Sequence, residues 1–304
     1  RSLAVAATEH AATRHYMARC IGRTETPLYT HFAMLTETPA LRLICDAQAA
    51  YVRRNLAGTG AEGLPLLSAA APFKVGGRGG VPQFTAIPAG PLSLRNIADL
   101  YTFPNTIRAV RVTGAEVAEW LERAAAAYLR VSAGGRGQPL FDPGFPSYNF
   151  DMISGISYHF DLSAPPRHDR QGRLINPAGG RLRGLLFEGR PVDPAEEFVV
   201  ATNNYRVAHL AASGMVPRIV LASETTNREV LVAHVEAIGR VAAPAAPNWA
   251  ISLPEGTSVE FDTGPGAMDA APPIPCLAVE SLGPSAPGLI RLRLRGQSAA
   301  AAAE

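Results

Sequence analysis

Two stretches near the start of the chain repeat their apolar residues at helical spacing. The first covers residues 6–19, and we expect it to end at Gly22, because glycine readily takes the left-handed conformation found just past helix ends. The second begins after Pro39. Its apolar face, which we expect to lie in the core, comprises Leu41, Ile44, Ala47, Gln48 and Tyr51.

A third helix is expected directly after a strand. Residues 108–113 alternate arginine with small or β-branched residues, as a strand with one solvated face does, and Gly114 separates them from the helix. The apolar stripe of this helix comprises Val117, Trp120, Leu121, Ala124 and Tyr128. The polar face opposite, expected to be solvated, comprises Glu116, Glu119, Glu122 and Arg123.

The remaining pattern is dominated by short strands. Residues 64–80 are small and glycine-rich, so we interpret them as a loop. Strands are expected at residues 155–162, 184–187, 198–202, 258–261 and 289–294. The pattern predicts an α+β fold of mixed sheets and packed helices with a β-rich C-terminal tail. We divide the chain into an interdomain helix (residues 1–22), a main domain (23–250) and a C-terminal extension (251–304). The last residues of the extension, 298–304, are expected to form a frayed end.

Composition excludes several classes of protein. The chain has 304 residues, enough for a sizeable core, and no run of 18 apolar residues that could span a membrane. Its formal charge of +2 is spread over separated arginines, so we do not expect it to bind polymeric nucleic acid. Cys20, Cys45 and Cys276 are widely spaced and predict neither a disulfide framework nor a zinc site.

None of the complete catalytic motifs occurs in the chain. It has no GxSxG, no HExxH, no GxxxxGK[ST] and no GxGxxG that opens a helix. Residues 76–80 lack the lysine and hydroxyl of a phosphate loop, and we interpret them as a flexible turn. The closest histidines, His10 and His15, lie on different sides of a helix. We therefore expect no catalytic residue and no metal site in this chain.

Two segments have a composition suited to binding. Residues 67–77 (LSAAAPFKVGG) contain Lys74, which is either a surface lysine in a turn or a charge that meets an anion beside exposed amides. Residues 99–106 (DLYTFPNT) place Phe103 and Asn105 in a turn before a strand. Phe103 could present its ring to a flat base, and Asn105 could bond the edge of the base or the sugar. For Tyr101, core packing is the expectation.

A third segment follows directly on a strand. Residues 201–206 (ATNNYR) combine amides, an aromatic ring and a guanidinium, which serve either as turn residues or as groups that bind a nucleoside. The candidates are Asn203, Asn204, Tyr205 and Arg206.

The chain resembles the C-terminal domain of the 5'-nucleotidase superfamily, and specifically bacterial bifunctional 2',3'-cyclic-nucleotide 2'-phosphodiesterase/3'-nucleotidases. Four stretches carry the resemblance in the family's order: LSAAAPFKVGG, IADLYTFPNTIRAVRVTGAEVAEWLE, PSYNFDMISGISYHFDLSAPPR and FVVATNNYR. Together they span residues 21–249. One departure is residues 207–214, where the family has a glycine-rich turn with an aromatic residue.

The resemblance implies that this domain holds the nucleoside with its base between two aromatic rings. Phe103 matches one ring and Tyr205 the other, with Tyr148 of PSYNFD as the alternative. Asn105 matches a polar residue near the base, and Lys74 falls where related 5'-nucleotidases have an arginine that contacts substrate.

The resemblance also implies what lies outside the chain. An N-terminal metallophosphoesterase domain, joined in cis, would hold two divalent metal ions and carry out the hydrolysis, in a periplasmic or secreted protein. The isolated chain would then be inactive. Two alternatives stay open: the C-terminal domain of a 5'-nucleotidase or sugar-nucleotide hydrolase, and a stand-alone nucleotide-binding module.

Overall fold

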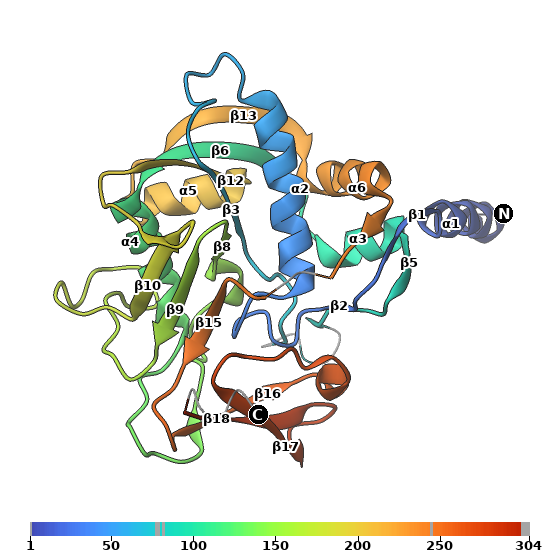
Figure 1. The fold of residues 1–304 in the computed structure, drawn as a ribbon. Helices are drawn as coiled ribbons and strands as arrows, with labels where there is room; N and C mark the ends of the chain where they lie inside the picture. Colours follow the sequence, from blue (N-terminus) through green and yellow to red (C-terminus); the bar gives the residue numbers. More distant parts are fainter. Residues whose placement is uncertain (1, 77–79, 81–82, 244–245, 299–304) are drawn as a thin grey trace.

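A five-stranded mixed sheet forms the centre of the computed structural model, which describes residues 2–76, 80, 83–243 and 246–298 (Figure 1). Its order is β13-β6-β12-β3-β8. Its strands are β3 (Leu66–Ala70), β6 (Thr106–Thr113), β8 (Met152–Ser154), β12 (Glu197–Asn203) and β13 (Arg218–Thr226). The central strand β12 runs parallel to β3 and antiparallel to β6. It is buried on both faces, which is why its sequence is apolar without alternation.

Five helices pack on or beside this sheet. They are α2 (Pro39–Asn55), α3 (Leu94–Leu100), α4 (Gly114–Ala124), α5 (Asn204–Ala212) and α6 (Asn227–Ile238). Capping boxes fix the first turns of α3, α4 and α6, because a side chain three residues into each helix bonds back to the cap. The helices expected after Pro39 and Gly114 are thereby confirmed, and residues 108–113 lie in β6 as expected.

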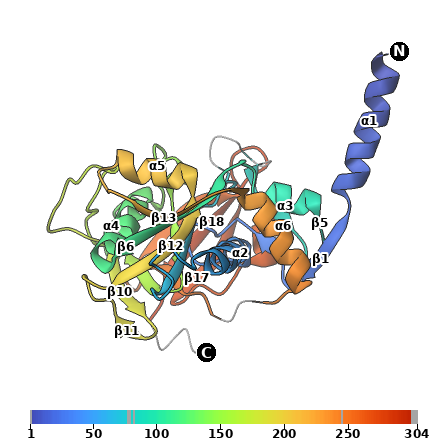
Figure 2. The same ribbon diagram turned by 90° about the horizontal axis from the view of Figure 1, so that it is seen from above.

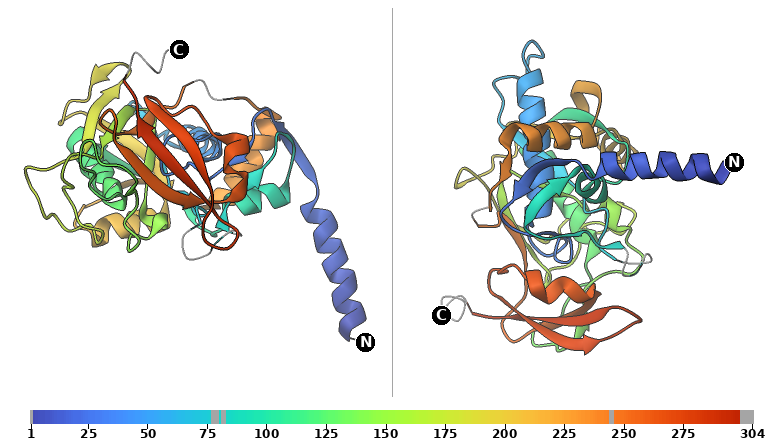
Figure 3. Two further views of the ribbon diagram at one scale, coloured as in Figure 1. Left: turned by 90° about the horizontal axis from the view of Figure 1, so that it is seen from below. Right: turned by 90° about the vertical axis from the view of Figure 1, so that its right-hand side faces the viewer.

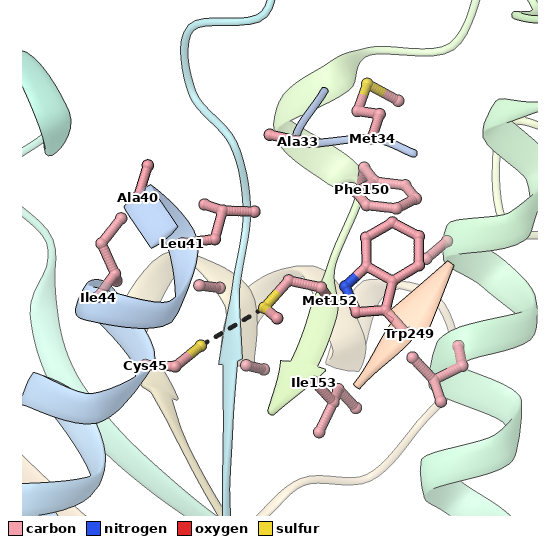
Figure 4. Close-up of a cluster of buried hydrophobic side chains, with 14 of the residues drawn as sticks. Ala33, Met34, Ala40, Leu41, Ile44, Cys45, Phe150, Met152, Ile153 and Trp249 are labelled. Carbon is pink, nitrogen blue, oxygen red and sulfur yellow. Dashed lines mark hydrogen bonds between the residues drawn. The ribbon is translucent and has the colours of Figure 1, made fainter. Parts of the chain in front are cut away.

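The apolar face of α2 lies in the core. Leu41, Ile44 and Cys45 are each about 1% exposed. Figure 4 shows this face of α2 turned toward Met152 of β8, with the Cys45 and Met152 sulfurs 3.5 Å apart, and Trp249 beyond. Burial raises the pKa of the Cys45 thiol far above its ordinary value, so this thiol is unreactive at neutral pH.

Four smaller sheets complete the described part of the fold, which also contains short 3-10 turns. The sheets have the orders β11-β10-β9-β15, β14-β1-β5, β17-β18-β16-β7 and β2-β4. Their strands are β1 (Cys20–Thr24), β2 (Leu28–Tyr29), β4 (Ala86–Ile87), β5 (Gly90–Ser93), β7 (Gln138–Pro139), β9 (Ser157–Asp161), β10 (Leu182–Phe187), β11 (Arg190–Pro191), β14 (Arg240–Val241), β15 (Trp249–Ser252), β16 (Ser258–Thr263), β17 (Leu277–Pro284) and β18 (Ile290–Gly296). The turns are η3 (Ala125–Ala127), η4 (Ser147–Asn149) and η5 (Pro265–Ala270).

The C-terminal sheet forms a layer of its own on one side of the body (Figure 3). It contains the strands expected at residues 258–261 and 289–294. It is not separate from the rest, because β16 pairs with β7 from the middle of the chain and Phe261 and Leu292 join the common core. The expected domain boundary at residue 250 falls inside β15. Of the expected frayed end, residues 299–304 lie outside the described residues.

The expected end of the first helix at Gly22 is wrong. Helix α1 (Ser2–Met17) ends earlier and projects from the body, as Figure 2 shows, and Gly22 lies within strand β1. Glycine is required there by close packing, because a Cβ at this position would lie 2.7 Å from the Val235 side chain and 3.0 Å from the Gly239 carbonyl. No helix among the described residues is long and apolar enough to cross a membrane.

The expectation of a loop throughout residues 64–80 is also wrong. Strand β3 lies there and pairs with both β12 and β8. Its small residues gave no alternating signal because four of its five residues are buried. The turn expected at residues 76–80 falls partly outside the described residues, which exclude 77–79.

The assignment of Glu122 to a solvated face is wrong as well. Its side chain is buried, and the two carboxylate oxygens accept the backbone N–H groups of Arg181 (3.0 Å) and Leu182 (2.7 Å). A segment distant in the sequence covers this part of α4, so the helical pattern alone could not place the carboxylate. The apolar stripe on the opposite face, including Trp120 and Tyr128, is buried as expected.

Candidate functional site

Two of the three candidate segments meet at one edge of the central sheet. In the antiparallel pair of β6 and β12, Asn203 lies opposite Ile107, so the turn before β6 and the residues after β12 share this edge. The Asn204 side chain joins them by accepting the Thr106 backbone N–H at 3.0 Å. The sheet register and this bond therefore bring the turn that contains Phe103 and Asn105 beside the start of α5.

Phe103 stands out from this edge, supported from one side. Its side chain is 48% exposed, and its ring meets the ring of Phe73 edge to face, with centroids 5.2 Å apart. Phe73 in turn packs against Tyr101 at 4.9 Å. The segment that contains Lys74 thus reaches the same edge through its neighbour Phe73.

The hydroxyl of Tyr101 ties the two segments together beneath the surface. Tyr101 is buried as expected, and the Asn203 amide donates to its hydroxyl at 3.1 Å. The Asn105 side chain is close enough to lower the pKa of this hydroxyl, and the Asn105 backbone carbonyl accepts the Asn227 N–H at 2.8 Å. Burial raises the pKa of Tyr101 to about 12, against the opposing effect of the Asn105 and Asn203 side chains, so the hydroxyl is neutral at physiological pH.

The first turn of α5 presents Tyr205 to solvent. Asn203 caps the helix by accepting the Arg206 N–H at 2.9 Å, which fixes the direction in which the next residues point. Tyr205 is 40% exposed and donates its hydroxyl to the Asn149 side chain at 3.1 Å. Burial raises its pKa above the ordinary value.

Tyr148 lies beside Tyr205. Its side chain is 46% exposed, and the two ring centroids are 6.3 Å apart at an angle of 76°. His209, one turn further along α5, is parallel to the Tyr205 ring at the same centroid distance. Burial lowers the pKa of His209, so this ring is neutral at pH 7. The candidate wall therefore contains two tyrosines and a histidine.

Arg206 lies beneath this wall instead of on its surface. It is 2% exposed, and its Nε lies 2.7 Å from Oδ2 of Asp151, which is itself buried. Burial raises the pKa of Asp151, and the contacts with Arg206 and Trp120 oppose that shift. In this conformation the guanidinium contacts protein groups and is not presented to solvent.

Lys74 also has a protein partner. Its ammonium pairs with the carboxylate of Asp99 near the end of α3, and its side chain is mostly buried. An anion that reached Lys74 would have to compete with this carboxylate.

Three of the four exposed large aromatic side chains in the described part of the chain belong to this edge. They are Phe103, Tyr148 and Tyr205, and the fourth, Tyr16, is on the projecting helix α1. Phe103 and Tyr205 each have ring partners, Phe73 for the first and Tyr148 and His209 for the second. Sequence reasoning named the three exposed rings but missed their supports. The helical spacing of Tyr205 and His209, four residues apart, was the one signal that could have found a support.

Other parts of the surface offer different chemistry. One hollow beside β1, β5 and β14 is lined by Arg23, Thr24, Glu25, Ala89, Gly90 and Arg240. Among residues 2–76, 80, 83–243 and 246–298, no group of three or more His, Cys, Asp or Glu side chains could hold a metal ion. The described residues thus do not fit the two-metal centre that the sequence resemblance implies for the family.

Comparison with known proteins gives a consistent family match. Residues 20–213 match the family model described as 5'-nucleotidase, C-terminal domain. The chain is 39% identical over 273 residues to the 2',3'-cyclic-nucleotide 2'-phosphodiesterase/3'-nucleotidase of Haemophilus influenzae, covering 86% of this chain and 42% of that protein. It is 37% identical to the trifunctional nucleotide phosphoesterase protein YfkN of Bacillus subtilis, covering 84% of this chain and 18% of that protein. The chain thus spans less than half the length of these relatives.

Solved structures share the fold. A 5'-nucleotidase precursor from Thermus thermophilus matches with a TM-score of 0.56 at 17% identity, over 79% of this chain and 41% of that one. The NAD nucleotidase of Haemophilus influenzae matches with a TM-score of 0.55 at 15% identity, over 81% and 40% of the two chains. At these identities the likeness concerns the fold alone, and it agrees with the α+β class expected from the sequence.

Proposed function

The chain belongs to the 5'-nucleotidase C-terminal domain family, and we propose that it is the nucleoside-binding part of a longer phosphoesterase. The whole protein would hydrolyse 2',3'-cyclic nucleotides at the 2' position and then release phosphate from the resulting 3'-nucleotides. The names of the relatives in Haemophilus influenzae and Bacillus subtilis support this assignment of substrate class.

The observation that carries the proposal is the gathering of exposed aromatic rings at one edge of the central sheet. Phe103 stands on one segment, and Tyr148 and Tyr205 stand on two others. An exposed ring with a supported edge suits stacking on a base, which contributes about 1 to 3 kcal/mol per base and tolerates any base. Broad nucleotide specificity follows from this mode of binding.

The amides around the rings supply the polar part of the site. Asn204 is exposed at the start of α5 and Asn105 is half-buried in the turn before β6, and both are near enough to this edge to meet the edge of a base or a sugar hydroxyl. Asn203 and Arg206 are buried and act through the residues that they hold. Lys74 would meet the phosphate only by exchanging its contact with Asp99.

The hydrolytic chemistry belongs to a metallophosphoesterase domain elsewhere in the longer protein. Two divalent ions held there would supply the attacking hydroxide. Energy gained by stacking at the distant base would position the phosphoester over that centre, which converts binding into rate. As the family resemblance implies, the protein would act in the periplasm or after secretion.

Thermal unfolding of the chain tests the binding function. Because a ligand that binds only the folded state stabilises it by mass action, 3'-AMP at about 100 times its dissociation constant should add about 2.7 kcal/mol to the free energy of unfolding. Inorganic phosphate at the same concentration serves as the control. An unfolding midpoint that 3'-AMP leaves unchanged up to millimolar concentrations would count against nucleoside binding.

The division of labour has a separate test. The purified chain with added Mn²⁺ or Co²⁺ should not turn over bis-p-nitrophenyl phosphate, whereas the longer protein should. Significant turnover by the chain alone would overturn the proposal that the chemistry lies outside it. The sequence upstream of Arg1 distinguishes the alternatives, because a DxH motif followed by GNH[DE] favours the enzyme and a signal peptide directly before Arg1 favours a stand-alone module.

A further inference from the structure

A charged pair is buried directly behind the two tyrosines. Arg206 and Asp151 are 2% and 3% exposed, and Nε of the arginine lies 2.7 Å from Oδ2 of the aspartate. Trp120 of α4 donates its indole N–H to the same oxygen at 2.6 Å. A buried ion pair is often no more stabilising than well-packed apolar residues of the same volume. Its presence here therefore calls for a role other than stability.

The contacts of Arg206 point to that role. Its Nη2 donates to the backbone carbonyl of Tyr148 at 2.7 Å, and its guanidinium carbon lies 5.7 Å from the centroid of the Tyr205 ring. Asp151 is three residues after Tyr148 in the sequence. Arg206 therefore contacts this short segment twice, at the Tyr148 carbonyl and at the Asp151 carboxylate. Its own backbone N–H is fixed by the cap of α5. One side chain thus touches both segments that carry the exposed tyrosines.

We propose that Asp151, Arg206 and Trp120 form a positioning network that holds the Tyr148 and Tyr205 rings together as a preformed wall of the nucleoside site. The proposal rests on the function inferred above. None of the three network residues is itself required to touch the nucleoside. The hydrogen bond from the Tyr205 hydroxyl to Asn149 closes the arrangement at the surface.

Preorganisation gives the network a measurable consequence. Two exposed rings on separate segments would otherwise lose side-chain freedom when a base binds, and that loss weakens binding. The arrangement also depends on the shape of the guanidinium, because one planar group reaches the carboxylate and the carbonyl at once. Lysine keeps the charge but lacks this fork, so Arg206→Lys separates the geometry from the charge.

The test compares ring contact with nucleoside affinity. In the free protein, nuclear Overhauser effects between the Tyr148 and Tyr205 ring protons report the 6.3 Å ring pair directly. Arg206→Lys should abolish these effects and weaken adenosine binding, measured by calorimetry, about tenfold or more. The matched control is Arg190→Lys, since Arg190 also pairs with a carboxylate, that of Glu196, and lies over an aromatic ring, yet is exposed and remote. This control should change neither readout.

A second variant covers the case in which Arg206→Lys does not fold. Asp151→Asn combined with Arg206→Met removes both charges, so no unpaired charge is left in the core, while the tie to Tyr148 is lost. It should show the same loss of ring contact and affinity. Folded variants that keep both the ring contact and the wild-type affinity would overturn the proposal. Failure of both variants to fold would also overturn the proposal, because the Arg206–Asp151 pair would then be required for folding of the core.

The nucleoside-binding function and the positioning network can be refuted independently of each other. If wild-type chain binds no adenosine, the proposed function is wrong, whatever the rings do. If wild-type chain binds adenosine but the ring contact survives in Arg206→Lys, the positioning network is wrong and the binding function stands.

Discussion

Truncation of the aromatic rings at the sheet edge should weaken nucleoside binding without unfolding the chain. Phe103 and Tyr205 are 48% and 40% exposed, so replacing either with alanine leaves little buried volume empty. Phe103 loses one edge-to-face contact with Phe73, and Tyr205 loses contacts with Tyr148 and His209. We therefore expect each variant to lose about 1 kcal/mol or less in the free energy of unfolding.

The expected loss in affinity is larger. Stacking contributes about 1 to 3 kcal/mol per base, which corresponds to a dissociation constant about 5 to 150 times higher for each variant. Calorimetric titration with adenosine measures this change. Tyr205→Phe retains the ring and removes only the bond to Asn149, so its affinity should stay within about tenfold of the wild-type value.

Two further variants define what would refute this reasoning. Tyr16→Ala removes an exposed aromatic from the projecting helix α1 and should leave adenosine binding unchanged. Tyr148→Ala decides between the two tyrosines as the second stacking ring. If Phe103→Ala and Tyr205→Ala both keep the wild-type dissociation constant within about twofold while folded, the stacking assignment is wrong.

Three predictions concern the fold. Glu122→Ala leaves the backbone N–H groups of Arg181 and Leu182 without their acceptors and removes the carboxylate that most favours the charge of the buried Arg181 guanidinium; chemical denaturation should show a loss of about 3 kcal/mol or more. Gly22→Ala forces a methyl group against Val235, and the same assay should show a loss of about 1 to 3 kcal/mol. Burial lowers the pKa of His31 below its ordinary 6.5, so its contribution to stability is complete above that pH and is lost as the pH falls below it; the midpoint of thermal unfolding should therefore drop as the pH falls below about 6.5, less steeply in His31→Phe.

Each of these three stability predictions has an outcome that would contradict it. Wild-type stability in Glu122→Ala would mean that the carboxylate is not needed to satisfy the segment that covers α4. An unchanged free energy of unfolding in Gly22→Ala would show that β1 and α6 tolerate a wider separation. If the midpoint of thermal unfolding falls equally with pH in wild type and in His31→Phe, His31 does not contribute to the loss of stability in acid.

The sequence predicted well where a repeating pattern reported a single buried face. The helices after Pro39 and Gly114 and strand β6 were confirmed for this reason. Prediction failed where burial came from distant segments. Strand β3 is covered on both faces, Glu122 is covered by residues 181–182, and Gly22 is required by the approach of α6. None of these contacts leaves a periodic signal in the local sequence.

In the candidate site too, the sequence predicted some residues and missed others. Phe103, Tyr148 and Tyr205 were predicted from local composition and family resemblance, and the structure exposes all three at one edge. The partners that hold them come from elsewhere in the chain, and sequence spacing does not indicate such pairings. Arg206 illustrates the difference, because a residue expected to face substrate lies behind the wall and bonds the backbone of Tyr148.

The central claim is that this chain by itself recognises the nucleoside part of a nucleotide. The most direct measurement is calorimetric titration of the wild-type chain, without added metal, with adenosine, 3'-AMP and ribose 5-phosphate. The account predicts saturable binding of adenosine and 3'-AMP with similar affinities and much weaker binding of ribose 5-phosphate, because the base supplies most of the contacts. No binding of adenosine, or equal binding of all three compounds, would contradict it.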